Sequence, residues 1–332
     1  METRKVQVTG GSTYTVSLPK GWATDNDVSA GSIVEFHSED DLLLLSPKRE
    51  QDRVEGTLDI TGLDTEHELT RAVMTMYVSG FDVITLETNR ISATQRRVIR
   101  DATQGLVGLE VIEETSDRVV LQDLLDSSEL SVHNAITRMR LVSLTMLEDA
   151  VEALITNDDE LAQDVKERDD DVDRLWYMVS RVFRTVLRNP TAATEIGFPR
   201  DTCFDFQSSA RQLERIADHA TKIADLALEV EAIPESAADP LRTLQSKASA
   251  VPETAMDALL ADEAEEATEL ANKARAQIQE VDSRVRAVDK EIREYDPQLA
   301  QVLSLVVDSL SRTADYGGNI AESALQKAAP RP

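Results

Sequence analysis

The chain has 332 residues, which is long enough for two or three domains that each have a hydrophobic core. Its 62 acidic and 35 basic residues give a formal net charge of −27, and its single cysteine, Cys203, excludes an intrachain disulfide. No apolar run is long enough to span a bilayer and the N-terminus is polar, so we expect a cytoplasmic protein without direct membrane insertion.

The charge also bears on the source of the chain and on its partners. Only nine of the 35 basic residues are Lys, and this acidic, lysine-poor composition resembles that of proteins from halophilic archaea. In molar salt the Debye length falls to about 3 Å, so a large negative charge does not repel nucleic acid at long range. Net charge therefore leaves DNA open as a partner.

Residues 1–50 are predicted to form a small β domain. Apolar and polar residues alternate on both sides of Gly10-Gly11, which indicates two short strands joined by a turn. Apolar runs at 33–36 and 42–45 predict two more strands. Because four short strands bury few apolar residues, we expect this domain to form a homodimer.

This N-terminal segment resembles the AbrB/SpoVT swapped-hairpin DNA-binding domain. The resemblance rests on residues 8–22 (VTGGSTYTVSLPKGW) and 28–36 (VSAGSIVEF). It implies a dimeric barrel in which Arg4, Lys5 and Lys20 contact the phosphates of promoter DNA. Residues 1–53 contain six basic and nine acidic side chains, so a dimerisation module with ordinary surface charges is the alternative.

Residues 54–124 alternate strand and helix patterns and are predicted to form a small α/β connector domain. Arg96, Arg97 and Arg100 lie on one short predicted helix, where they could contact an anion, although a solvated helix face is the more frequent role. No glycine-rich phosphate loop accompanies them. The predicted elements are strands at 56–61, 82–87, 108–114 and 118–122 and helices at 65–79 and 92–105.

The rest of the chain has the period of long helices, so the fold class is mainly α. Apolar residues recur at three- and four-residue spacing from Val132 to Leu154. The predicted helices form two groups of three, at 128–232 and 238–328, which indicates two repeated three-helix bundles. After the first helix, the predicted helices cover about 158–188, ending at Asn189-Pro190, then 200–231, 241–261, 263–294 and 297–327.

An internal repeat supports this grouping. Residues 213–225 (LERIADHATKIAD) return 97 residues later as residues 310–322 (LSRTADYGGNIAE). Helical spacing places Glu214, Asp218 and Asp225 on one stripe, where they repel one another unless a positive charge lies between them.

The repeat resembles the PhoU family of phosphate-signalling regulators, in its archaeal type, over residues 128–327. The resemblance rests on residues 169–177 (DDDVDRLWY) and 214–220 (ERIADHA), which carry the family's acidic motifs. It implies a PhoU-like bundle that binds iron, zinc or magnesium. It also implies a protein that restrains phosphate uptake when phosphate is plentiful, in communication with a phosphate ABC transporter.

Paired carboxylates on two facing helices can surround a divalent cation with oxygen ligands, which suits magnesium, manganese or iron. In the alternative interpretation, Arg174, Arg215 and Lys222 neutralise the acids through helical salt bridges. The second repeat departs from the motif because Ser311 replaces the Glu, so its metal site is in doubt. The candidate metal ligands are Asp169, Asp173, Glu214, Asp218 and Asp225, with Asp308, Asp315 and Glu322 in the second repeat.

Enzyme chemistry finds little support in the sequence. No Ser-His-Asp set, Cys-His pair or Glu-x-x-His motif can be nominated, and we expect His219 to be a ring packed between helices. We therefore expect a dimeric, non-enzymatic regulator of phosphate homeostasis that also binds DNA. The alternatives are an AbrB-type transcription regulator whose bundle senses another signal, and a carboxylate-bridged metal hydrolase or oxidase.

Overall fold

The computed structural model describes residues 2–39, 42–48, 53–63, 65–125, 131–189, 192–193 and 196–330. The chain divides into two compact units, Met1–Arg53 and Val54–Pro332. Two of the expected helix boundaries fall on Pro190 and on residues 126–130. These residues lie outside the described part of the chain.

The N-terminal unit contains two antiparallel hairpins. One pairs β1 (Gln7–Thr9) with β2 (Thr13–Thr15), and the other pairs β3 (Val34–Glu39) with β4 (Leu42–Pro47). The short helix α1 (Lys20–Asp25) follows Pro19 and was not predicted, because six residues are too few to display a helical period. None of the described side chains in this unit is buried.

The second unit begins with the expected α/β domain. Its elements are β5 (Glu55–Asp59), α2 (Glu66–Val78), β6 (Val83–Glu87), α3 (Ala93–Gln104), β7 (Leu109–Glu114) and β8 (Arg118–Asp123). The sheet order is β5-β6-β8-β7, with β5 and β6 parallel and β8 antiparallel to both of its neighbours. The fully buried side chains of Tyr77, Ile84 and Leu86 lie in the core of this domain.

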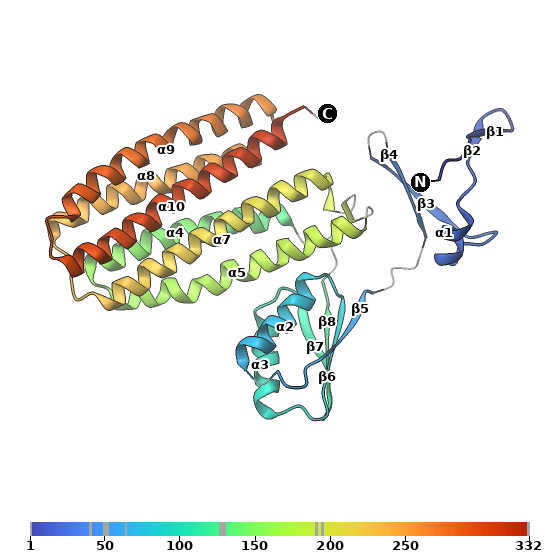
Figure 1. Ribbon diagram of the computed structural model, residues 1–332, viewed down its shortest axis with the longest axis horizontal. Coiled ribbons are helices and arrows are strands. Elements are labelled where there is room, and N and C mark those ends of the chain that lie inside the picture. Colours follow the sequence, from blue (N-terminus) through green and yellow to red (C-terminus); the bar gives the residue numbers. More distant parts are fainter. Residues whose placement is uncertain are drawn as a thin grey trace. The chain divides into compact units, whose positions relative to one another are not determined.

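Long helices form the remainder, in two groups of three (Figure 1). The first group is α4 (Val132–Thr156), α5 (Asp159–Arg188) and α7 (Arg200–Glu229). The second is α8 (Glu235–Leu260), α9 (Ala264–Ile292) and α10 (Pro297–Ala328). Each group packs within itself, and the groups meet where α7 packs on α10 and α4 packs on α8. The mainly α fold with two three-helix units is therefore confirmed.

A contact between equivalent residues shows how the two repeats are related. Nε2 of His219 lies 3.2 Å from the hydroxyl of Tyr316, and their ring centroids are 5.6 Å apart. These two residues occupy the same position in the 97-residue repeat, so an approximate twofold axis passes between α7 and α10. The expectation that His219 packs between helices is confirmed.

The start of α8 differs from the prediction. The helix begins at Glu235, although a helix beginning after Pro240 was expected. Pro240 is the sixth residue of the helix, where a missing N–H removes a single intrahelical hydrogen bond early in its length. None of the described helices is long and apolar enough to cross a membrane.

Candidate acidic site on the first three-helix repeat

Four carboxylates face one another between α5 and α7, and we call them the acidic cluster. Asp169 and Asp173 lie on α5, and Glu214 and Asp218 lie on α7. Within each helix the two acids are four residues apart, which places them on one face, and the two helices pack directly on each other. The spacing that the sequence showed thus brings both acidic pairs to one helix interface.

Burial and nearby negative charges raise the pKa of three of these carboxyl groups. Burial raises the pKa of Glu214 to about 7, helped by the charge of Asp218 and opposed by Arg211. Burial, with the charges of Asp173 and Asp218, raises the pKa of Asp169 to about 6. Burial also raises the pKa of Asp173, although a hydrogen bond from Tyr177 acts in the opposite direction.

Arg211 is the cation that the structure places at this cluster. Its guanidinium pairs with Oε1 of Glu214 and lies 5.3 Å from the ring centroid of Trp176. The other carboxylate oxygen of Glu214, Oε2, is buried and has no hydrogen-bond partner. Sequence reasoning missed Arg211, although its three-residue spacing from Glu214 was a usable signal.

Among the described residues, none of the cations expected to neutralise the cluster, which are Arg174, Arg215 and Lys222, makes an ion pair with it. Arg215 lies over the ring of Tyr316, 5.7 Å from its centroid. Within the described part of the chain, Lys222 makes no ion pair with Asp218. Among the described residues, the ion pair at the cluster is that of Arg211 with Glu214, and the charges of Arg211 and Arg215 both act to lower the pKa of Glu214.

The donor chemistry of the cluster fits a hard cation. Four carboxylates supply oxygen donors, and the unpartnered Oε2 of Glu214 is a buried acceptor that a cation would satisfy. In the side-chain positions described, however, no three Asp, Glu, His or Cys groups are close enough together to hold a metal ion. Side-chain rotation would have to gather the carboxylates around an ion.

Comparison with known proteins bears on both units. A model of the PhoU domain matches residues 136–227, and a model of "Antidote-toxin recognition MazE, bacterial antitoxin" matches residues 7–52. The crystal structure of PhoU from Pseudomonas aeruginosa superposes with a TM-score of 0.51 at 26% identity, covering 60% of this chain and 96% of that one. Residues 136–227 thus match the PhoU domain, and the helical bundle is similar in fold to PhoU.

Two curated relatives agree with this assignment. The "Phosphate-specific transport system accessory protein PhoU homolog" of Pseudomonas aeruginosa is 28% identical over 179 residues, which is 52% of this chain and 72% of the relative. The protein of the same name from Pseudomonas putida is also 28% identical over 179 residues, covering 52% of this chain and 68% of that relative. The α/β domain lies outside the two segments that the family models match, residues 136–227 and 7–52.

The remaining candidate ligands of the PhoU bundle lie outside the acidic cluster. Asp225, on α7, pairs with Lys166 of α5 at 2.7 Å. In the second repeat, Asp315 is exposed and pairs with Arg312 at 3.5 Å. The other two candidates of that repeat are also exposed on α10, and they are Asp308 and Glu322.

Packing explains why the second repeat carries no matching cluster. Ile278 of α9 lies against Gly318 of α10, where an added Cβ would come within 2.9 Å of the Ile278 Cδ1. Gly318 is the repeat counterpart of Thr221, which lies beside Asp169 in the first repeat. An apolar side chain therefore faces α10 where a carboxylate faces α7.

The basic residues proposed for DNA contact lie on the surface of the MazE-like unit. Arg4 is exposed and pairs with Glu2 at 2.6 Å. Lys5 and Lys20 are exposed, and Lys20 is the first residue of α1. All three are therefore available to a ligand within this unit.

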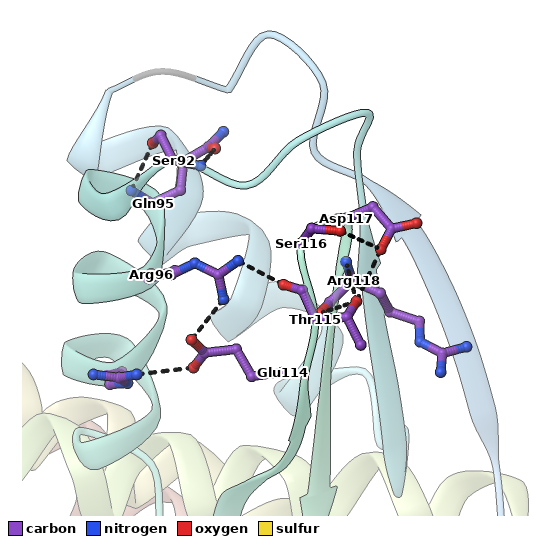
Figure 2. Close-up of polar contacts among 9 residues, drawn as sticks. Ser92, Gln95, Arg96, Glu114, Thr115, Ser116, Asp117 and Arg118 are labelled. Carbon is purple, nitrogen blue, oxygen red and sulfur yellow. Dashed lines mark hydrogen bonds and ion pairs between the residues drawn. The ribbon is translucent and has the colours of Figure 1, made fainter.

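The arginines of α3 have a partner within their own domain. Arg96 and Arg100 pair with the two carboxylate oxygens of Glu114 on β7, at 2.5 and 2.9 Å, and lower its pKa. Figure 2 shows Arg96 reaching both Glu114 and the backbone carbonyl of Thr115. These two side chains attach α3 to the end of β7, and Arg97 is exposed.

Proposed function

We propose that this protein regulates phosphate transport and that it does so in part by binding DNA. The observation that carries the proposal is the joining of a PhoU bundle to a MazE/AbrB-like unit in one chain. Relatives of the bundle are named as accessory proteins of a phosphate-specific transport system, which supports a regulatory and non-enzymatic role. A component of a phosphate ABC transporter is the partner that these names suggest for the bundle.

The N-terminal unit acts as a homodimer in this proposal. Large apolar side chains on its strands are more than half exposed: Val8 at 62%, Tyr14 at 76% and Phe36 at 58%. A β domain that leaves such side chains in water gains by burying them against a second copy. Sedimentation analysis of the full chain should give a dimer, and Tyr14→Ser with Phe36→Ser should weaken it. A monomer at all concentrations would contradict this part.

The acidic cluster is the site at which the bundle would take a divalent or trivalent cation: iron, zinc, manganese or magnesium. Bound there, the ion would offset much of the negative charge of the four carboxylates and satisfy Glu214 Oε2. Elemental analysis of the purified wild type and of Glu214→Ala/Asp218→Ala tests this, with Glu265→Ala/Glu269→Ala on the exposed face of α9 as the matched control. Loss of metal in the cluster variant alone supports the site, whereas metal-free wild type after reloading contradicts it.

Footprinting on the promoters of phosphate-transport genes tests the DNA role. The full chain should protect a defined segment, and Lys5→Glu/Lys20→Glu should lose protection while remaining folded. Absence of protection at these promoters would contradict a direct role in transcription and would leave only the transport-accessory role.

One alternative remains open, in which the chain is an AbrB-type regulator whose bundle senses a signal other than phosphate status. The division of the chain after Arg53 allows a direct comparison with residues 54–332 alone. If the truncated chain loses promoter control but still binds a transporter component, the phosphate proposal is favoured. Promoter control that ignores phosphate supply would favour the alternative.

A further inference from the structure

A buried arginine joins the first PhoU repeat to the α/β domain. Arg181 of α5 is 5% exposed, and its Nη1 donates to the backbone carbonyls of Tyr77 and Phe81, both at 2.9 Å. Its Nη2 lies 2.8 Å from Asp82 Oδ1 and 2.9 Å from Asp123 Oδ2. With four oxygen partners in a buried setting, this side chain fixes α5 to the α/β domain.

Asp82, one of these partners, also forms hydrogen bonds with the first residue of the second unit. Oδ2 of Asp82 accepts a hydrogen bond from the backbone N–H of Val54 at 2.8 Å, and the N–H of Asp82 donates to the carbonyl of Val54 at 2.7 Å. Val54 is the first residue of the second unit, so the chain arrives there from the DNA-binding unit. The carboxylate of Asp82 therefore connects Arg181 to Val54, where the chain enters the second unit.

The acidic cluster is joined to the α/β domain by a second residue of α5, which lies one turn before Arg181. Tyr177 of α5 donates its hydroxyl to Oδ2 of Asp173 at 3.3 Å. The ring of Tyr177 packs against the hydrophobic core of the α/β domain. Tyr177 and Arg181 are four residues apart, so they lie on the same face of α5.

We propose that these residues form a coupling path, the α5 relay, which transmits the state of the acidic cluster to the segment that carries the DNA-binding unit. The relay comprises Asp173, Tyr177, Arg181, Asp82 and Val54. It rests on the proposed function insofar as the cluster is the sensing site. It uses the α/β domain, which neither family match covers, and it gives that domain a role as the connection between sensor and DNA-binding unit.

Hydrogen–deuterium exchange of the full chain tests the relay without any ligand. Tyr177→Phe keeps the ring and removes only the hydroxyl contact with Asp173. We expect exchange in residues 54–59 to accelerate by about two- to tenfold, the effect of losing one hydrogen bond, with no change in α10. Asp308→Asn, on the exposed face of α10, is the matched control and should leave residues 54–59 unchanged.

A second background checks that the effect passes through Arg181. In Arg181→Lys, which keeps the charge but loses the four-acceptor geometry, adding Tyr177→Phe should no longer alter exchange in residues 54–59. Unchanged exchange in 54–59 on Tyr177→Phe alone would overturn the relay. Equal acceleration in α10 would also overturn it, because it would indicate general destabilisation.

Titration with MnCl₂ separates this inference from the cation proposal. Calorimetry on the wild type reports whether Mn²⁺ binds, and exchange on the same sample reports whether residues 54–59 respond. Binding together with slower exchange in 54–59 supports both, and binding without that response overturns the relay. If Mn²⁺ does not bind, manganese is excluded as the ion of the acidic cluster, and the variants alone decide the relay.

Discussion

At the scale of single residues, burial distinguishes acids that look alike in the sequence. Glu214 is 7% exposed, whereas Asp308, Asp315 and Glu322 on α10 are exposed. The helical spacing of the acids could be predicted from the sequence, because it depends only on the local helical period. Their burial could not be predicted from the sequence, because it depends on which helix packs opposite each stripe of acids.

The raised pKa of Glu214 predicts a pH dependence of stability. Between its ordinary pKa and about 7, the folded state binds a proton that the unfolded state has released, so the free energy of unfolding falls as pH rises through this window. Glu214→Gln removes this penalty and should raise the free energy of unfolding by on the order of 2 kcal/mol at about pH 8, with little change at about pH 4.5. Urea unfolding at both pH values measures the difference. Parallel pH profiles for the two proteins would contradict the burial argument.

Arg181 permits a second prediction at this scale. Arg181→Met leaves Asp82 and Asp123 without their shared cation, and we expect a loss of about 3 kcal/mol in the free energy of unfolding. Arg188→Met is the matched control on the same helix, because Arg188 is exposed and contacts only the Ser79 carbonyl among the described contacts. A loss no larger than the control's would show that the buried pair does not stabilise the domain contact. Arg181 was not predicted because its partners lie 58 to 104 residues away in the sequence.

At the scale of elements, local signals predicted most helices and failed at two places. Asp296 caps α10 by accepting from the N–H groups of Gln298 and Leu299, with Pro297 at the first helical position, as expected. The short α1 and the early start of α8 were missed. In α8 the tertiary contacts of Ala237 and Ala238, both buried, extend the helix past a proline that local propensity treats as a boundary.

Two neighbouring glycines of α10 provide a test of helix packing. A Cβ on Gly317 would lie 2.5 Å from the backbone nitrogen of Pro252 in α8, which cannot move aside. Gly317→Ala should therefore destabilise the protein by about 1–3 kcal/mol despite the better helix propensity of Ala. Gly318→Ala meets only the Cδ1 of Ile278, the end of a flexible side chain, and should cost less. Thermal unfolding that ranks the two in the opposite order would contradict the packing.

At the scale of the whole molecule, the net charge of −27 sets the conditions for folding. Self-repulsion of this size destabilises a compact state and is screened by salt. Raising KCl from about 0.2 M to about 2 M should therefore raise the unfolding temperature, and sucrose at matched water activity should raise it less. An unfolding temperature independent of KCl would contradict the expectation of a high-salt protein.

More of the order of domains along the chain could be predicted than of the contacts between those domains. The repeat, the helix periods and the N-terminal motif predicted a β domain, an α/β domain and two three-helix repeats, together with resemblances to two families, because each signal lies within a continuous stretch of sequence. The contact between the helical bundle and the α/β domain could not be predicted, since Tyr177 and Arg181 carry no local signal that they contact this domain. For the whole molecule, we propose that the PhoU-like bundle and the N-terminal unit act together, the latter by binding DNA.

Occupancy of promoters in the source cells tests that claim most directly. The tagged full chain would be crosslinked to DNA and mapped in phosphate-replete and phosphate-starved cultures, with residues 54–332 as the control. We expect enrichment at phosphate-transport promoters that changes with phosphate supply and is absent for the control. Enrichment that ignores phosphate supply, or none above the control, would contradict it.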